Sequence, residues 1–329
     1  MFDVFGLGNA LVDTEVNVEE DFLVEHNVAK SLMTLVESDR MAELSAHLEA
    51  KPHTRCSGGS AANTIFAVQG FGRSAAFTGK VAKDEVGDFF LQDLANAGIT
   101  VNTNARSDEG RSGQCFIMIT PDAERTMNTD LGESRTLGTQ NVPIEHVANA
   151  TWCYIEGYLC AQPDSVQAAI LCHDTAKQAG RKTAITLSDP SMVEFFRDNL
   201  TAMMGNGVDL IFCNEEEALA WAKTDRLDIA IKELQDIAPL SFVTLGAKGS
   251  MAVEGTSAKA ADGFKIEAKD ATGAGDIYAG AAFCALLNGA EPVQAARFAN
   301  FCAADIVSRY GARLKSVEDY AALANRFTA

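Results

Sequence analysis

Asp270-Ala271-Thr272-Gly273-Ala274-Gly275-Asp276 leads into a stretch, Ile277 to Leu287, that is apolar on nearly every side. A helix with apolar residues all round is buried, so this segment predicts a core helix that begins at a glycine-rich turn. Asp276 is the only charged residue between Ala271 and Ala290. Because a buried carboxylate is costly unless it is hydrogen-bonded or paired, we expect Asp276 to have a partner or a use.

The turn before this helix has the features of an anion-binding site. Gly273, Ala274 and Gly275 carry little or no side chain, so a ligand can reach the backbone N–H groups at the positive end of the helix. Asp276 adds a carboxylate that can accept the proton of an attacking hydroxyl, and phosphoryl transfer needs both features. The same turn also fits a plain glycine-rich helix start capped by Asp276.

Strands and helices alternate along most of the chain. Helical periodicity predicts helices from Asp84 to Ala97 and from Pro163 to Gly180. Buried strands are predicted at Phe2 to Leu7, Thr183 to Leu187, Val208 to Cys213 and Leu240 to Leu245. This alternation predicts an α/β fold, in which a mainly parallel central sheet is covered by helices on both faces.

Two segments break the alternation, Thr14 to Glu20 and about Val101 to Arg135, where short strand-like runs follow one another without helices. We expect them to pair into a small β lid. The predicted division is a large α/β domain of residues 1–13, 21–100 and 136–329, and a discontinuous lid of residues 14–20 and 101–135.

Composition narrows the function classes for this chain of 329 residues. Its 27 Lys and Arg against 45 Asp and Glu give a net charge of −18, which disfavours nucleic acid and anionic membranes as partners. No apolar run is long enough to span a membrane and no signal peptide is evident, so we expect a cytoplasmic protein. The eight cysteines show no metal or redox spacing, and the five histidines no zinc-site pairing.

Several motifs together resemble the ribokinase-like (PfkB) carbohydrate and nucleoside kinases. The segment from Asp270 to Asp276 looks like the C-terminal motif of that family. Its N-terminal motif is matched by Gly58-Gly59-Ser60-Ala61-Ala62-Asn63, Gly70-Phe71-Gly72 and Gly79 to Gly87. With the segments Gly8 to Asp13 and Thr120 to Met127, the chain is most similar to bacterial members called adenosine kinases or sugar kinases. The resemblance implies a ribokinase-like three-layer fold with a small β lid.

The resemblance also implies site residues and cofactors. The donor would be ATP with Mg²⁺, Asp276 would be the catalytic base with a low pKa, and the amides of Gly273, Ala274 and Gly275 would hold the transferred phosphoryl group. The implied acceptor-binding residues are Asp13, Gly58, Gly59, Asn63 and Arg125. The implied nucleotide-binding residues are Asn214, Glu217, Thr244, Gly246, Gly249 and Asn300. Glu217 would hold Mg²⁺ through water, and Asp270 and Thr272 match positions that bind a monovalent cation, so potassium is a further expectation.

Plainer roles stay open for several of these residues. Asn300 lies on an apolar helix face and needs a polar partner, which adenine or the protein itself can supply. Asn63 also fits a plain helix start, and Arg125 a solvated position on the lid. The three glutamates from Glu215 to Glu217 also fit a helix start whose dipole they complement. The turn from Gly246 to Gly249 fits an ordinary hairpin.

Adenosine, converted to AMP, is the first expectation for the acceptor. The alternatives are a sugar kinase of the ribose, fructose or 2-keto-3-deoxygluconate type, and a non-catalytic sensor on the same fold. Phe22, Phe116 and Met118 are candidate walls for a base. The lid would either close a single subunit or pair two into a homodimer. A Rossmann oxidoreductase and a P-loop NTPase are excluded, since neither glycine pattern is complete.

Overall fold

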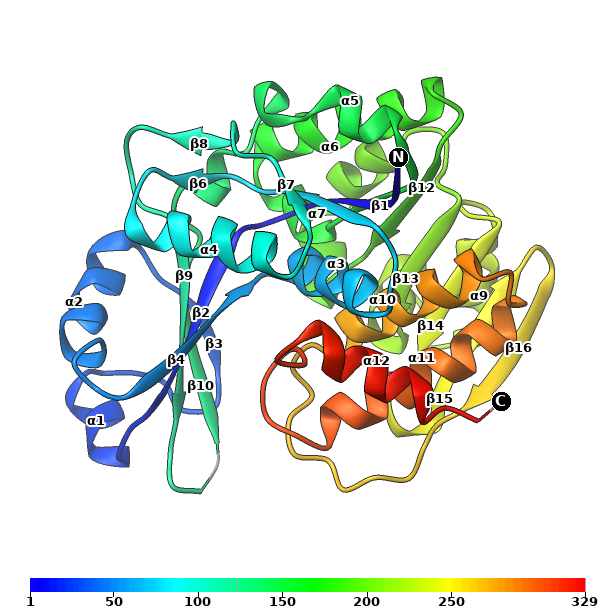
Figure 1. Ribbon diagram of the computed structural model, residues 1–329. Coiled ribbons are helices and arrows are strands. Elements are labelled where there is room, and N and C mark those ends of the chain that lie inside the picture. Colours follow the sequence, from blue (N-terminus) through cyan, green and yellow to red (C-terminus); the bar gives the residue numbers. More distant parts are fainter. Residues whose placement is uncertain (123, 329) are drawn as a thin grey trace.

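The molecule is built on a nine-stranded sheet with helices on both sides, in a computed structural model that describes residues 1–122 and 124–328 (Figure 1). Ala123, in the segment from Thr120 to Met127, lies outside the described residues. Along the sheet the strands are β16 (Ser257–Asp262), β15 (Gly249–Glu254), β14 (Leu240–Thr244), β13 (Leu210–Asn214), β12 (Lys182–Thr186), β11 (Ala150–Ile155), β1 (Phe2–Leu7), β5 (Ala75–Thr78) and β7 (Thr100–Val101). From β7 to β14 all neighbours are parallel, and β15 runs antiparallel to both β14 and β16.

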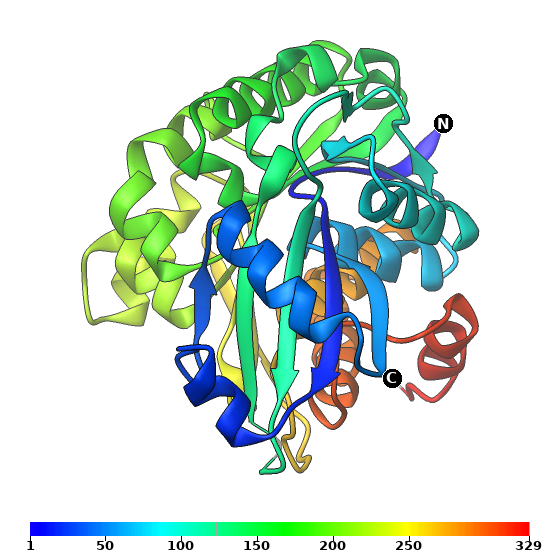
Figure 2. The same ribbon diagram turned by 90° about the vertical axis from the view of Figure 1, so that its left-hand side faces the viewer.

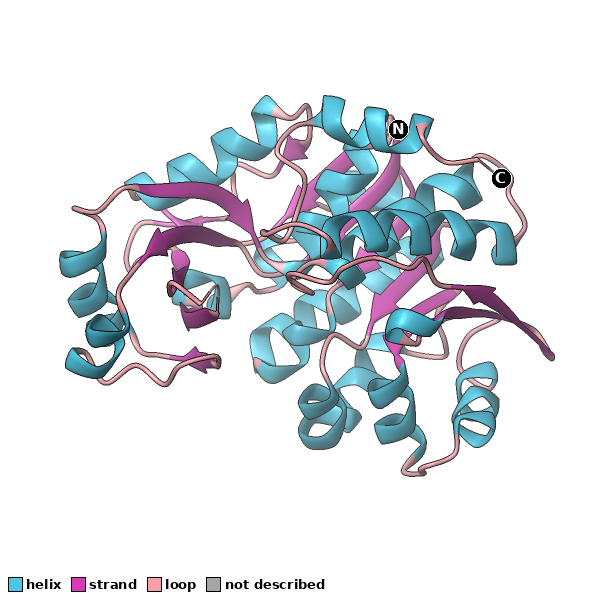
Figure 3. Cartoon of the chain, turned by 90° about the horizontal axis from the view of Figure 1, so that it is seen from below, coloured by secondary structure: helices cyan, strands magenta, loops and turns pink. Residues whose placement is uncertain are grey.

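Two hydrophobic cores lie on opposite faces of this sheet because successive strand residues point to opposite sides. Val4 of β1 belongs to one core, and Phe5 and Leu7 to the other. The first core is covered by α3 (Ser60–Gly70), α4 (Glu85–Asn96), α10 (Ala274–Leu287), α11 (Pro292–Val307) and α12 (Val317–Asn325). The second is covered by α5 (Ile144–Ala148), α6 (Pro163–Gln178), α7 (Pro190–Met204), α8 (Glu215–Ala222) and α9 (Leu227–Gln235). Figure 3 shows helices on both sides of the strands, so the predicted three-layer α/β class is confirmed.

A second sheet forms the lid at one end of the molecule (Figure 1). Its strands, in spatial order, are β3 (Met33–Leu35), β10 (Arg125–Asp130), β9 (Gly113–Ile119), β2 (Leu11–Asn17) and β4 (His53–Gly58). The predicted boundaries assign β3 and β4 to the large domain, and the structure differs there. Neither segment has a strand-like sequence, because β3 has only three residues and β4 is largely polar.

The outer face of the lid is covered by two helices of its own, α1 (Glu20–Glu25) and α2 (Ser38–Leu48), which cross in front of the lid strands in Figure 2. Val16, Phe116 and Met118 of the sheet pack with Leu44 and Leu48 of α2 in a third hydrophobic core. The remaining elements are the short strands β6 (Val81–Ala82) and β8 (Arg106–Ser107), and the 3-10 turns η1 (Gly132–Thr136), η2 (Thr139–Asn141), η3 (Gly157–Ala161) and η4 (Gly246–Lys248).

Close packing of α10 against α3 determines where the catalytic elements meet. A Cβ added at Gly280 would lie 2.5 Å from Cβ of Ala67 and 2.9 Å from the carbonyl oxygen of Thr64, so the two helices approach as closely as a glycine allows. The first turns of both helices therefore open onto the same cavity. In residues 1–122 and 124–328, the structure contains no helix with the length and apolar character that crossing a bilayer requires.

Candidate active site

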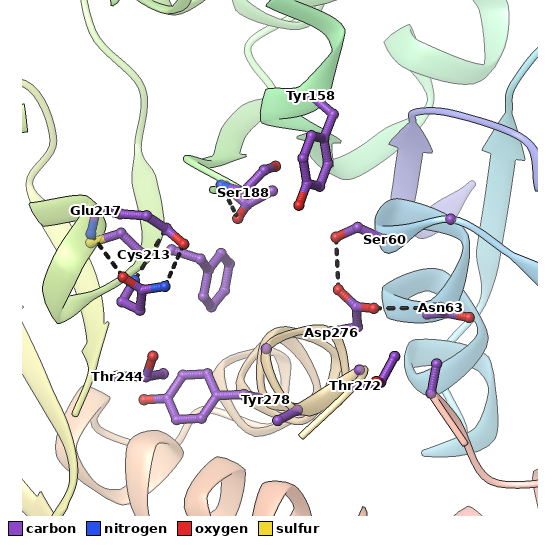
Figure 4. A pocket seen from close by; sticks show the side chains of 18 of the residues that line it. Ser60, Asn63, Tyr158, Ser188, Cys213, Glu217, Thr244, Thr272, Asp276 and Tyr278 are labelled. Atoms are coloured by element: carbon purple, nitrogen blue, oxygen red, sulfur yellow. Dashed lines mark hydrogen bonds between the residues drawn. The ribbon is translucent and has the colours of Figure 1, made fainter. Parts of the chain in front are cut away.

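Asp276 lies in the first turn of α10 and points toward the first turn of α3 (Figure 4). The Ser60 hydroxyl donates a hydrogen bond to Oδ1 of Asp276 at 2.7 Å, and the Asn63 side-chain amide donates to Oδ2 at 3.1 Å. These bonds supply the partner that the sequence predicted for the lone carboxylate. They also fix its orientation toward a cavity of about 470 Å³.

Burial raises the pKa of Asp276 to about 6, and the bonds from Ser60 and Asn63 oppose that rise. The sequence predicted a low pKa from the helix N-terminus, and that prediction was wrong in direction. Removal of the carboxylate from water outweighs the helix dipole because the side chain is enclosed between α10 and α3. A base with a pKa near 6 is closer to neutrality, which favours proton transfer from a hydroxyl.

The glycine-rich turn is shaped by contact with the segment that follows α11. Gly273 has a left-handed backbone with φ of +75°, and an added Cβ would overlap the carbonyl group of Ala312. Gly275 is open: among the described residues, no protein atom lies within 4 Å of a Cβ built there. Gly273, Ala274 and Gly275 all line the cavity beside Asp276, as the sequence predicted for an anion cradle.

On the lid side of the same cavity lies Asp13, on β2. A Cβ added at Gly58 would overlap the carboxylate of Asp13, so a glycine is needed there for β4 to approach Asp13 closely. Gly59 and Asn63 also line the cavity, whereas Gly58 lies behind Asp13 and does not. Burial raises the pKa of Asp13 to about 7.

Asn214 and Glu217 lie at the start of α8 and line the same cavity. Glu217 lies at the wall opposite Asp276 (Figure 4). They form a reciprocal cap: Asn214 Oδ1 accepts the N–H of Glu217 at 2.8 Å, and Asn214 Nδ2 donates to Glu217 Oε1 at 2.6 Å. The two residues therefore cap α8, and they also face the cavity. Burial raises the pKa of Glu217 to about 7, so its charge is poorly compensated by the protein alone.

A second cavity of about 670 Å³ lies between η4, α10 and α11. Thr244, Ala274, Gly275 and Tyr278 line both cavities, so the two spaces meet at the anion cradle. The predicted nucleotide residues Gly246, Gly249 and Asn300 line the second one. Gly246 and Gly249 have φ of +59° and +101°, conformations that favour glycine in this turn.

Asn300 is held by the protein itself. Its side-chain amide donates to the carbonyl oxygens of Ala261 at 2.9 Å and Asp262 at 3.2 Å, at the end of β16. We expect Asn300→Leu to lower the free energy of unfolding by about 1–3 kcal/mol, because the buried carbonyl of Ala261 and the partly buried carbonyl of Asp262 lose their donor. Urea denaturation measures this loss. Unchanged stability together with a raised KM for ATP would instead assign the amide to nucleotide contact.

Arg125 and Asp270 lie next to each other at the junction of the lid with the loop before α10. Arg125 Nε is 3.3 Å from Asp270 Oδ2, with side-chain exposures of 7% and 5%, and Arg125 Nη2 donates to Glu15 Oε1 at 2.5 Å. Arg125 is therefore buried, and the solvated-lid reading was wrong. Asp270 also accepts the N–H groups of Thr272 and Gly311, each at 2.9 Å.

Several cavity residues were missed by the sequence analysis. They are Ser60, Tyr158, Thr186, Ser188, Tyr278 and Ala312. Thr186 and Ser188 follow the carboxyl end of β12, where side chains of parallel strands converge on a common edge, and that general rule was the available signal. Ser60 stands inside the quoted motif Gly58 to Asn63, but nothing in the local pattern shows that it bonds to Asp276.

The three side chains predicted to line a nucleobase pocket lie elsewhere in the structure. Phe116 and Met118 are buried between the lid sheet and α2, and Phe22 packs against the same core, so these side chains lie on the far side of the lid. Side chains alternate along a strand, so Ile117 points to the opposite face, as does Cys115, the register partner of Asp13. Ile117 pairs with Met127, and Met127 with Met33. These three residues, Ile117, Met127 and Met33, form an apolar row on the face that carries Asp13.

Comparison with known proteins gives a consistent result. Residues 30–319 match the pfkB family carbohydrate kinase model. An adenosine kinase of Sinorhizobium meliloti has 34% identity and a TM-score of 0.87, with 98% of this chain and 99% of that chain covered. A probable sugar kinase of Rhizobium etli has 31% identity and a TM-score of 0.87, with 98% of each chain covered. Adenosine kinase of Saccharomyces cerevisiae is 28% identical over 87% of this chain and 88% of that protein.

The family match covers most of the chain, and the cavity presents the family's glycine-rich motif and its aspartate together. ATP is the phosphoryl donor that this family implies, generally with Mg²⁺. The chain therefore belongs to the pfkB family of carbohydrate kinases and is a phosphotransferase that uses an alcohol group as acceptor.

Proposed function

We propose that this protein transfers the γ-phosphoryl group of ATP to the primary hydroxyl of adenosine, giving AMP. The observation that carries the proposal is the meeting of the two cavities at Ala274 and Gly275, with Asp276 beside them. ATP in the larger cavity would present its γ-phosphoryl group at the helix N-terminus, and an acceptor against Asp13 would present its hydroxyl to Asp276. Phosphoryl transfer requires this alignment of donor, acceptor and base.

The proposal assigns a role to each residue around the cavity. Asp13 accepts hydrogen bonds from two vicinal hydroxyls of the acceptor, and Gly59 and Asn63 border the same space. Asp276 accepts the proton of the primary hydroxyl, and the amides of Gly273, Ala274 and Gly275 bind the oxygens of the transferred group. Arg125 holds the lid to Asp270 through their ion pair.

Mg²⁺ fits the cavity as a companion of ATP. Glu217 is a buried carboxylate on the cavity wall with a raised pKa, which a cation would lower. No group of three or more metal-ligating side chains occurs in the described part of the chain, so phosphate and water would supply most ligands. Mg²⁺ when bound would offset the negative charge of the phosphate oxygens.

A potassium ion fits Asp270 poorly, because two N–H groups and Arg125 already surround that carboxylate.

Adenosine is favoured over a free sugar by the apolar row of Ile117, Met127 and Met33. Met33 is 52% exposed and Ile117 only 3%, so Met33 is the end of the row that a ligand could cover. A purine base can cover Met33 while the ribose hydroxyls reach Asp13, whereas a free sugar bound at Asp13 leaves Met33 in water. The sugar kinase reading remains the second candidate, supported by the likeness to the Rhizobium etli protein.

An ADP-release assay with ATP and Mg²⁺ tests the proposal. The acceptors are adenosine, inosine, ribose, fructose and 2-keto-3-deoxygluconate, each with and without potassium. We expect saturable turnover with adenosine, well above the sugars and independent of potassium. Preferred turnover with a sugar would assign the second candidate, and ATP binding without turnover of any acceptor would favour the sensor.

The proposed roles of Asp13 and Asp276 also predict how the rate depends on pH. Both carboxylates act in the ionised form, and their pKa values are raised to about 7 and about 6. We therefore expect kcat/KM for the acceptor to rise with pH and to level off above about pH 8, one pH unit above the higher pKa. Asp13→Asn is expected to remove the part of the rise that is centred near 7. A rate that falls across the same interval would contradict this assignment.

A monomer and a cytoplasmic location are further expectations. The outer face of the lid sheet is covered by the chain's own α1 and α2, so Phe116 and Met118 need no second subunit to bury them. Sedimentation of the purified chain is expected to give the mass of a single subunit.

A further inference from the structure

Arg313 lies in the segment between α11 and α12 and is bound by three other elements. Its Nη1 donates to the Ser57 hydroxyl of β4 at 2.8 Å, and its Nη2 pairs with the Asp93 carboxylate of α4. The guanidinium also lies over the Phe66 ring of α3, 4.0 Å from the ring centroid. Its side chain is only 7% exposed. A buried arginine with three partners is held in one position.

The held position is against β4, the strand that pairs with the strand of Asp13. In the lid sheet Val12 pairs with Ser57 and Asp13 with Cys56, so the strand that Arg313 grips is the neighbour of Asp13. The Asp13 carboxylate itself packs on Gly58, the residue after Ser57. Arg313 and Asp13 therefore contact consecutive residues of β4, just before the glycine turn into α3.

We propose that Arg313 is a positioning residue for the acceptor: it fixes β4 beside Asp13 and keeps Asp13 in the carboxylate form that accepts the acceptor's hydroxyls. The proposal rests on the acceptor-binding role proposed above for Asp13. Arg313 does not line either cavity, so it acts through Asp13 and not by touching the ligands.

The groups around Asp13 support this role. Burial raises its pKa, Arg313 gives the largest opposing effect, and Glu15 and Asp276 add to the rise. The other facing groups are Arg125 and the thiols of Cys56 and Cys115. Arg125 is paired with both Glu15 and Asp270, so its charge is divided between two carboxylates. Arg313 has a single carboxylate partner, Asp93, which is itself partly exposed to solvent.

Arg313→Gln tests the proposal through the pH profile of kcat/KM for the acceptor, measured from about pH 5 to about pH 9. Removing the charge is expected to move the rise assigned to Asp13 upward by about one pH unit. At pH 7, kcat/KM for the acceptor then falls about fivefold, and about tenfold at lower pH, while KM for ATP stays near the wild-type value. Arg309→Gln is the matched control, because Arg309 is a half-exposed arginine of the same segment that pairs with Asp305. Its profile is expected to match the wild type.

Asp93→Asn is expected to shift the pH profile of kcat/KM in the opposite direction. It leaves the positive charge of Arg313 uncompensated, so the rise assigned to Asp13 moves to lower pH, a result that general damage to the fold does not produce. Arg313→Lys keeps the charge and is expected to keep the wild-type profile. An unchanged profile in Arg313→Gln, or a shift in the same direction in Asp93→Asn, would overturn the proposal.

A measurement without substrate separates this proposal from the proposed function. Carboxyl carbon NMR of the ligand-free protein, with the Asp13 signal assigned by its loss in Asp13→Asn, reports the ionisation of Asp13 directly. If the wild type phosphorylates none of the acceptors, the proposed function fails, and the NMR shift between wild type and Arg313→Gln still decides the electrostatic role. If Arg313→Gln does not fold, Arg313→Lys and Asp93→Asn provide the same comparison.

Discussion

Asp276→Asn is expected to lower kcat about a thousandfold while the protein stays folded and binds ATP. The substitution removes the proposed acceptor of the hydroxyl proton, and general-base catalysis contributes roughly two to four orders of magnitude to a rate. The fold is expected to survive because asparagine is isosteric and its carbonyl oxygen can still accept the bond from Ser60. Steady-state ADP release gives kcat, and calorimetry of ATP binding checks the second cavity.

Ser60→Ala serves as the matched comparison for Asp276→Asn. It removes one of the two hydrogen bonds to the carboxylate and leaves the base in place. We expect a much smaller loss of kcat, together with an upward shift of the pKa near 6, since the Ser60 bond opposes the effect of burial. If Asp276→Asn turns over near the wild-type rate, Asp276 is not the base.

Gly273→Ala is expected to reduce both stability and turnover. The left-handed backbone costs an alanine roughly 1–2 kcal/mol, and the new Cβ overlaps the Ala312 carbonyl, so the turn must move. Displacing the backbone donors from the phosphoryl group is expected to lower kcat about a hundredfold or more, the usual effect of losing one such donor. Urea denaturation and ADP release measure the two effects separately.

Substitutions at two other glycines separate the three effects expected in Gly273→Ala: backbone strain, overlap with protein atoms and contact with the ligand. Gly72 is exposed, has φ of +84°, and has no described atom within 4 Å of an added Cβ, so Gly72→Ala measures backbone strain alone. Gly275→Ala meets no such strain and no protein atom among the described residues, yet its Cβ enters the cavity. We expect it to keep wild-type stability and to raise KM for ATP. Equal kcat in Gly273→Ala and wild type would show that the cradle tolerates movement of this turn.

The sequence predicted the large sheet better than the lid, and packing explains the difference. Strands such as β13 and β14 are buried on both faces, so they are continuous apolar runs that can be read without knowledge of their neighbours. Strand β4 lies at a sheet edge and is mostly polar, so its pairing with β2 depends on contacts far along the chain. The alternation in β9 was also visible, but alternation alone does not say which face meets the ligand. Phe116 therefore seemed a candidate wall.

The candidate site also has a part that the sequence predicted and a part that it did not. The glycines and Asp276 form one short motif whose chemistry follows from its own residues. The orientation of Asp276 depends on Ser60 and Asn63, and the burial of Arg125 depends on Asp270, all of them distant partners in the sequence. Long-range partners determined the direction of the pKa shift of Asp276 as well, because burial by α3 outweighs the local helix dipole.

The interleaved order of the strands has a consequence for folding. Strand β1 pairs with β11, with Phe2 opposite Ala150, and β2 pairs with β9, with Leu11 opposite Gly113. By contrast, β11 to β14 each pair with the next strand along the chain. Contacts between distant segments form slowly because long loops must close first. In a growing chain β1 pairs only with β5 until β11 has been synthesised, so fragments that end before Ala150 leave one edge of β1 unpaired and are expected to be aggregation-prone.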